Sequence, residues 1–202
     1  MLDTINVLLI ITALVNLSLG ALIYFHGRNK RNNIIYSLNI VGITSWVLAM
    51  IIFRSSPPEY DLFWCTLLYI TPTFIASSLL YLSYIFPTQQ ADYKHWKTFL
   101  IFFINALLIV AIAYPGFMIT DVIVRGVGME KEIVFTQAYW FYFLYTAGFF
   151  TYGFIRLYNK YRKSVGLERV QTLYLYIGYS LAANLAFATN LIMPWIGYFF
   201  LN

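Results

Sequence analysis

Charge is the scarcest property of this chain of 202 residues, because Asp, Glu, Lys and Arg make up only 10% of it. Soluble proteins carry about 25% charged residues. With 61% hydrophobic residues and a mean hydropathy of +0.71, the chain has too few charged side chains to cover a water-exposed surface. The composition excludes a soluble globular protein and predicts one that lies in a membrane.

Residues that bind metals or perform catalysis are nearly as scarce. Cys65 is the single cysteine, and His26 and His95 are the only histidines, so no intramolecular disulfide can form and no cluster has metal-ligand spacing. No carboxylates pair inside an apolar segment, and no Ser, His and acid occur at one depth. The sequence predicts that this chain has no metal, no cofactor and no enzymatic activity.

The few charges leave six long charge-free segments. Each has the length of about 20 residues that a helix needs to cross a bilayer, and none holds two crossings comfortably. Membrane-spanning strands would alternate polar and apolar residues, which these segments do not. The sequence predicts an all-α fold, a polytopic membrane bundle that forms one domain over residues 1–202, with six transmembrane helices at about 4–25, 32–53, 62–86, 98–114, 136–158 and 170–193.

Prolines set several of the expected helix ends. Pro87, Pro115 and Pro194 should close the third, fourth and sixth helices, because the residue before a proline avoids the helical conformation. Only Pro72 lies inside a span. It should bend the third helix near Thr71 and leave a backbone carbonyl that needs another partner.

The distribution of Lys and Arg predicts the orientation. The loops after the first, third and fifth helices hold ten of the 13, and only Arg54, Arg125 and Lys131 lie on the other side. Lys and Arg resist translocation, so the ten-residue side is cytoplasmic and the amino terminus is outside. The net charge of +5 is then a topology signal, and nucleic acid is not an expected partner.

Uncharged polar and aromatic residues supply the candidate ligand site. Several lie at comparable depth in the outer half of the bundle, where a few polar groups in an apolar pocket are typical of small-ligand sites. Two plainer interpretations stay open, namely hydrogen bonds that hold helices together and an aromatic belt at the membrane surface. The residues proposed to bind a ligand are Trp46, Trp64, Thr71, Trp140, Asn184 and Asn190.

The loop from Phe117 to Gln137 has its own pattern. Apolar residues from Ile119 to Val124 precede Arg125 to Gly128, and a second apolar run follows at Ile133 to Phe135. This arrangement is typical of a short β-hairpin, which would cover the outer face.

These residues together resemble a known family, the amino-terminal seven-helix region of bacterial and archaeal sensor histidine kinases. The resemblance rests on Arg28 to Asn32, Tyr36 to Leu38, Trp46, Trp64, Leu67 to Tyr69, Pro72, the outer glycine-containing loop, Tyr161 to Gln171 and Asn190 to Pro194. It implies a seventh helix that leads into cytoplasmic PAS and kinase modules. Trp195 to Leu201 is too short to cross a bilayer, so we expect this chain to hold six helices and to lack both the seventh and any cytoplasmic effector domain.

The predicted function is a membrane-embedded sensory input domain of a signal-transducing histidine kinase in a two-component system, multi-pass in the plasma membrane of a prokaryote. It would bind a small apolar or uncharged ligand. A polytopic transporter for an uncharged solute is the alternative, and a structural membrane scaffold is the third interpretation. Charge-free spans disfavour proton relays and ion pathways. The expected partners are membrane lipids, a cytoplasmic kinase module or partner kinase, and a second copy of the chain as a homodimer.

Overall fold

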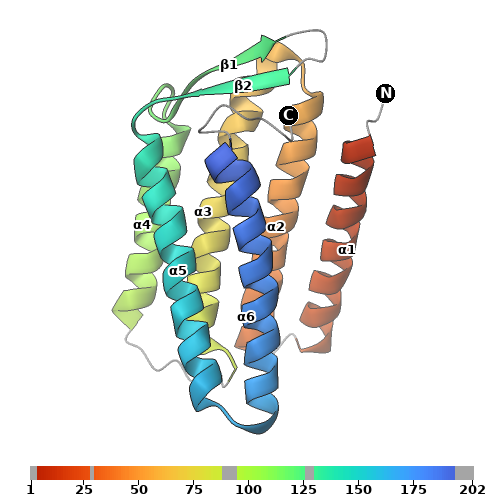
Figure 1. The fold of residues 1–202 in the computed structure, drawn as a ribbon, viewed down its shortest axis with the longest axis vertical. Coiled ribbons are helices and arrows are strands. Elements are labelled where there is room, and N and C mark those ends of the chain that lie inside the picture. The colour runs from red at the N-terminus through yellow and green to blue at the C-terminus, as the bar shows by residue number, and fades with distance from the viewer. Residues whose placement is uncertain (1–3, 28–29, 88–94, 126–129, 194–202) are drawn as a thin grey trace.

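The computed structural model describes residues 4–27, 30–87, 95–125 and 130–193, and six long α-helices account for most of them (Figure 1). A short 3-10 turn, η1 (Pro58–Tyr60), precedes the third helix, and a π-helical turn, η2 (Ala188–Ile192), extends the sixth. The long helices are α1 (Thr4–His26), α2 (Arg31–Ser55), α3 (Asp61–Ile85), α4 (His95–Ala113), α5 (Tyr139–Lys163) and α6 (Gly166–Phe187).

Consecutive helices run in opposite directions through one bundle (Figure 1). Across one end of it lies a hairpin of β1 (Ile119–Arg125) and β2 (Glu130–Phe135), which pair antiparallel. This confirms the predicted hairpin. We call this end the hairpin end, and the opposite end, which carries Lys30, Arg31 and Lys160 to Lys163, the basic end.

An all-α bundle was predicted, and the helices begin and end close to the predicted positions. Differences arise mainly at the basic end, where α5 continues to Lys163 and α6 begins at Gly166. Charge-free segments mark only the apolar part of a helix, whereas Lys and Arg are themselves good helix formers and extend it into the polar layer.

Four of the described helical segments are long and apolar enough to cross a membrane by length and composition. They are Thr4–His26, Arg31–Ser55, Pro58–Ile85 and Trp96–Ala113. The crossings by α5 and α6 remain predictions. Both helices lie side by side with the others in the same bundle (Figure 1).

Prolines act at the helix ends much as predicted. α3 ends at Ile85, shortly before Pro87, and α4 ends at Ala113, shortly before Pro115. Pro72 lies inside α3, where it cannot donate to the carbonyl of Leu68. The Thr71 hydroxyl lies 3.2 Å from the Leu67 carbonyl oxygen and 3.5 Å from that of Leu68. The predictions for Pro194 and for Trp195 to Leu201 fall outside the described residues.

α3 forms the centre of the bundle. It packs against α2, α4 and α5 and contacts β1. Two apolar clusters surround it, one toward each end. The cluster at the hairpin end includes Phe53, Cys65, Tyr69 and Met118, and the other includes Leu79, Ile85, Phe150 and Leu157. Cys65 is buried in the cluster at the hairpin end.

Candidate functional site

The buried polar groups in the middle of the bundle gather on α3 and bond it to α2 and α4, while α6 bonds to the same α2 amide. Asn39 on α2 is fully buried. Its Nδ2 donates to the Ser78 hydroxyl at 2.7 Å and to the Ile75 carbonyl oxygen at 3.0 Å, while the Tyr179 hydroxyl of α6 donates to Asn39 Oδ1 at 2.6 Å. One amide thus joins α2, α3 and α6 in an environment where unpaired polar groups are costly.

A second amide joins α3 to α4. Asn105 is 3% exposed, and its Nδ2 donates to the Ser77 hydroxyl at 2.8 Å. The Thr73 hydroxyl lies 3.4 Å from Asn105 Oδ1 and donates more closely, at 2.7 Å, to the Ile70 carbonyl oxygen of its own helix. Asn39 and Asn105 therefore bond to consecutive serines of α3, Ser78 and Ser77, from different helices, so a movement of α3 changes both sets of hydrogen bonds.

A buried ion pair fixes the hairpin to the bundle. Lys131 of β2 is 4% exposed and Asp61, the first residue of α3, is 1% exposed, and Lys131 Nζ lies 2.6 Å from Asp61 Oδ1. The same ammonium donates to the carbonyl oxygens of Phe53 and, at 2.9 Å, of Ser56 at the end of α2. One ammonium group therefore donates to backbone carbonyls at the end of α2 and pairs with the carboxylate at the start of α3.

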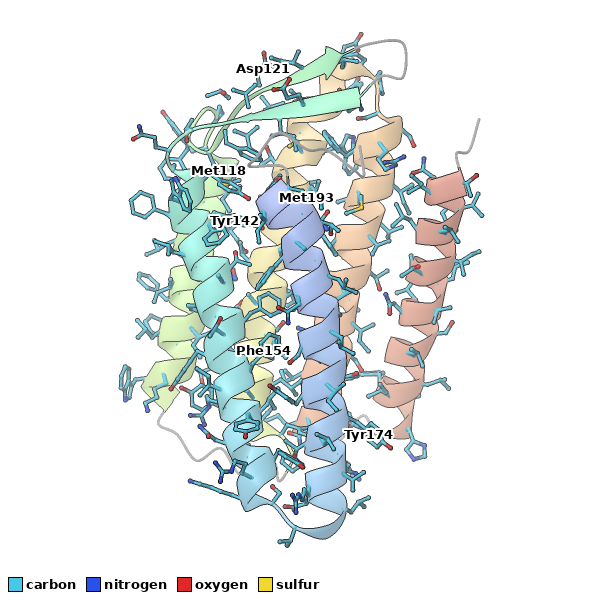
Figure 2. The ribbon with its side chains drawn as sticks, in the orientation of Figure 1. Met118, Asp121, Tyr142, Phe154, Tyr174 and Met193 are labelled. Carbon is cyan, nitrogen blue, oxygen red and sulfur yellow. The ribbon has the colours of Figure 1, made fainter. Side chains whose placement is uncertain are left out.

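Aromatic rings line the underside of the hairpin beside this pair. Tyr69 of α3 makes edge contacts with Phe135 and Tyr142, with ring centroids 5.4 Å apart in each case. Phe135 in turn lies 4.4 Å from Tyr139. Figure 2 shows Met118 and Tyr142 at this end, near the hairpin. The hairpin thus covers this end of the bundle and also packs its apolar side chains into the core.

Cations at the basic end are held by aromatic faces and carbonyls. Lys160 donates to the carbonyl oxygens of Tyr84, at 2.7 Å, and Phe86, at the end of α3. The Arg156 guanidinium lies 3.6 Å from the centroid of the Tyr84 ring, and Arg31 donates to the Tyr81 hydroxyl. α5 and α2 therefore both bind the same end of α3, through cation–π contacts and charge-assisted hydrogen bonds.

The six residues predicted to bind a ligand are not all brought together. Trp46 packs against both apolar clusters and Trp64 against the cluster at the hairpin end. Trp140 is 45% exposed and lies against Phe143. The amide of Asn184 bonds to the Ser180 carbonyl of its own helix, and Asn190 bonds to the Ala186 carbonyl and the Thr189 hydroxyl.

The π-helical turn that holds Asn190 was not predicted. It covers Ala188–Ile192 and directly follows Phe187, whose ring makes an edge contact with Phe150 of α5 at 5.2 Å. π-turns often occur at functional sites. Nothing in the spacing of this segment distinguishes a π-turn from an ordinary helix, so the sequence held no usable signal for it.

A cleft of about 790 Å³ opens elsewhere, between α1, α2 and α6 and toward the basic end. None of the six predicted residues lines it. Among the described residues there is also no group of three or more His, Cys, Asp or Glu that could hold a metal ion.

A comparison with protein families gives the family of this chain. Residues 8–200 match a family described as the N-terminal 7TM region of histidine kinase. The chain belongs to this family. The match covers nearly the whole sequence and agrees with the resemblance noted from its motifs. No curated protein and no solved structure matches the chain significantly. As a 7TM sensory region, it is a non-catalytic input domain in a membrane protein, associated with a cytoplasmic kinase module.

Proposed function

We propose that the chain senses a stimulus within the plasma membrane of a prokaryote, with the hairpin end outside and the basic end in the cytoplasm. The family match over residues 8–200 is the observation that carries this proposal. The orientation rests on the excess of Lys and Arg at the basic end. A kinase needs ATP, so its module belongs on the cytoplasmic side.

The output module is reached, in this proposal, through a seventh helix or through a partner polypeptide. α6 runs toward the hairpin end, so a further crossing is needed before the chain returns to the cytoplasm (Figure 1). A homodimer of the kinase would place two such bundles side by side. Movement of α5 and α6 against α3 is the proposed signal, because Arg156, Lys160 and Tyr179 connect these helices to α3 or to Asn39.

The proposed stimulus is a small apolar or uncharged ligand in the outer half, between α2, α3, α5 and α6. Trp46 packs against both apolar clusters, and Asn190 lies in the π-turn, a backbone irregularity that is frequent at functional sites. Trp64 and Thr71 belong to the proposed set from α3. Asn184 and Trp140 complete the proposed set from α6 and α5. A ligand shifts the populations of two states only through different affinities for them.

The sensory role is tested in the intact histidine kinase that contains this region, reconstituted in nanodiscs. Asn39→Leu breaks the contact between α2, α3 and α6, and we expect it to change the autophosphorylation rate by about twofold to thirtyfold, the usual range of coupling effects. Ser18→Ala is the matched control, since the Ser18 hydroxyl is exposed and, among the described residues, bonds only to the Leu14 carbonyl of its own helix. An unchanged rate in a folded Asn39→Leu kinase would contradict the role.

The transport alternative is tested in proteoliposomes with glycerol and urea as uncharged solutes. We expect the same permeability as in protein-free liposomes, measured by stopped-flow light scattering. Faster solute entry that depends on the protein would favour a transporter.

The ligand is sought by thermal-shift screening of charged and uncharged apolar compounds, and Asn190→Leu should abolish stabilisation by the uncharged ones. Stabilisation by charged compounds only would overturn the proposed ligand class.

A further inference from the structure

The cleft between α1, α2 and α6 is a feature that the proposed ligand site does not use. It extends from the middle of the bundle toward the basic end, where Phe86 and Pro87 complete its wall. Tyr174, which lines it, lies toward the basic end of α6 (Figure 2). Its volume of about 790 Å³ falls within the range of about 300–1,000 Å³ typical of small-molecule sites.

The basic end of the cleft favours an anion. Lys30 lines it and occupies the N-cap position of α2, where no side chain caps the helix. The first turn of α2 has no acidic residue, and Lys30 forms no ion pair with any residue that the structure describes. An uncapped helix start and an ammonium group attract the same kind of ligand, above all a phosphate.

The Asn32 side chain favours a ligand that carries a hydrogen-bond donor. It lines the cleft, is 7% exposed, and its Nδ2 donates to the Pro87 carbonyl oxygen at 2.8 Å. That carbonyl can only accept, so the orientation of the amide is fixed. Asn32 Oδ1 is left buried with no hydrogen-bond partner among the described atoms. A ligand hydroxyl beside the phosphate would satisfy it.

The remainder of the cleft is mixed: Asn16, Asn33 and Gln171 line it together with tyrosines, and an apolar strip runs along α6. Leu19 and Ile23 of α1, Ile40 of α2 and Leu175 of α6 form its walls. Gly178 lies in the α6 wall, and a Cβ built there would meet no atom within 4 Å. This space suits a flexible aliphatic chain that lies along the helices.

We propose that this cleft binds an anionic phospholipid of the phosphatidylglycerol class. The phosphodiester would lie at Lys30 and the start of α2, a headgroup hydroxyl would donate to Asn32 Oδ1, and an acyl chain would pass Gly178 between α1 and α6. The three parts of the lipid thus match the three parts of the cleft. The site is separate from the proposed sensory ligand in the outer half and does not depend on it.

The test is native mass spectrometry of the purified chain in detergent, titrated with phosphatidylglycerol, phosphatidic acid or phosphatidylcholine. We expect phosphatidylglycerol to bind most tightly and phosphatidylcholine, which has no hydroxyl donor and no net charge, to bind weakly. Lys30→Gln should weaken phosphatidylglycerol binding about tenfold or more, as expected for a lost charge-assisted hydrogen bond. Lys163→Gln, at an exposed cation outside the cleft, is the matched control.

Two further variants separate the parts of the site. Asn32→Leu should reduce binding of phosphatidylglycerol but not of phosphatidic acid, which lacks the headgroup hydroxyl. Gly178→Leu leaves the polar end unchanged and fills the chain space, so it should reduce binding of both lipids. If Lys30→Gln and Gly178→Leu bind phosphatidylglycerol as the unaltered chain does, the proposal is wrong.

The last measurement compares phosphatidylglycerol binding by the isolated chain with binding by the intact kinase. If phosphatidylglycerol binds the isolated chain but not the intact kinase, a helix of the kinase fills the cleft and the lipid proposal is overturned. The autophosphorylation test of the sensory role is kept separate by the choice of variant: Lys30→Gln alters the polar end of the cleft and leaves Asn39 and its partner Tyr179, which lines the cleft, unchanged. Failure of one proposal is therefore distinguishable from failure of the other.

Discussion

α1 and α3 are both apolar helices of similar length, yet their surroundings differ greatly. Of the 23 residues of α1, only Asn6, Ala13 and Gly20 are buried, whereas 16 of the 25 residues of α3 are buried. The three buried residues of α1 are spaced by seven, which is a single narrow stripe that packs against α2. α1 is therefore a peripheral helix with one contact face, and α3 is the centre on which the others converge.

The comparison shows that polar residues bonded to other helices distinguish the central helix better than mean hydropathy does. α1 has the higher mean hydropathy of the two segments, but its hydroxyls bond to its own backbone, as Thr12 does to Leu8 and Ser18 to Leu14. On α3, Ser77 and Ser78 receive hydrogen bonds from amides of other helices. Lipid tails are as apolar as the side chains they contact, so the hydrophobic effect does not drive helices together in a bilayer. Interhelical hydrogen bonds therefore contribute to holding the helices together.

The largest expected effect is at the hairpin end of α3. Lys131→Met leaves Asp61 buried without its cation, and a broken buried pair costs about 3–5 kcal/mol. We expect the free energy of unfolding, measured in bicelles with a chemical denaturant, to fall by that amount. The double variant Lys131→Met with Asp61→Asn should recover part of the loss, because no buried charge is then unpaired. A single variant as stable as the unaltered protein would show that the pair does not fix the hairpin.

A smaller effect is expected in the middle of α3. Asn39→Leu removes the amide that joins α2, α3 and α6, and we expect it to reduce the free energy of unfolding by about 2 kcal/mol. Tyr179→Phe removes only the hydrogen bond to Asn39 Oδ1 and should cost about 0.6 kcal/mol, the average for such bonds in membranes. Equal losses in the two variants would contradict the view that Asn39 joins three helices.

The smallest effect is expected on α1. Gly20→Ala would place a Cβ 3.0 Å from the Ile40 side chain of α2, so we expect a loss of about 1 kcal/mol from overpacking. Gly148→Ala in α5 is the control for helix propensity, since a Cβ there meets no atom within 4 Å, and it should raise the free energy of unfolding by about 0.5–1 kcal/mol. If both variants behave alike, α1 does not pack on α2 through the stripe that contains Gly20.

Much of the fold follows from the sequence because it depends on local patterns. The charge-free segments predict the six helices, Pro87 and Pro115 predict two of their ends, and the apolar runs on either side of Gly126 to Gly128 predict the hairpin. Those signals lie within one segment of chain. They do not indicate how far a helix continues into its basic flank, which is why α5 extends beyond the predicted end.

The interior polar contacts could not be predicted in the same way. Lys131 and Asp61 are separated by 70 residues, and each looked like a loop charge in the sequence. Asn39 was visible as a polar residue in a span, but its partners on α3 and α6 depend on how three helices pack. The cleft at the basic end likewise depends on the distance between α1 and α6, which no local pattern encodes.

The most direct test of the account is the side of the membrane on which each end lies. Glu59→Cys places a thiol at the hairpin end, and Val165→Cys places one on a residue that is 80% exposed at the basic end. Native Cys65 is fully buried and should give little background. We predict that an impermeant maleimide labels Glu59→Cys in intact cells and Val165→Cys only after the membrane is opened. Labelling of Val165→Cys in intact cells, with Glu59→Cys protected, would contradict a sensor whose basic end faces a cytoplasmic kinase.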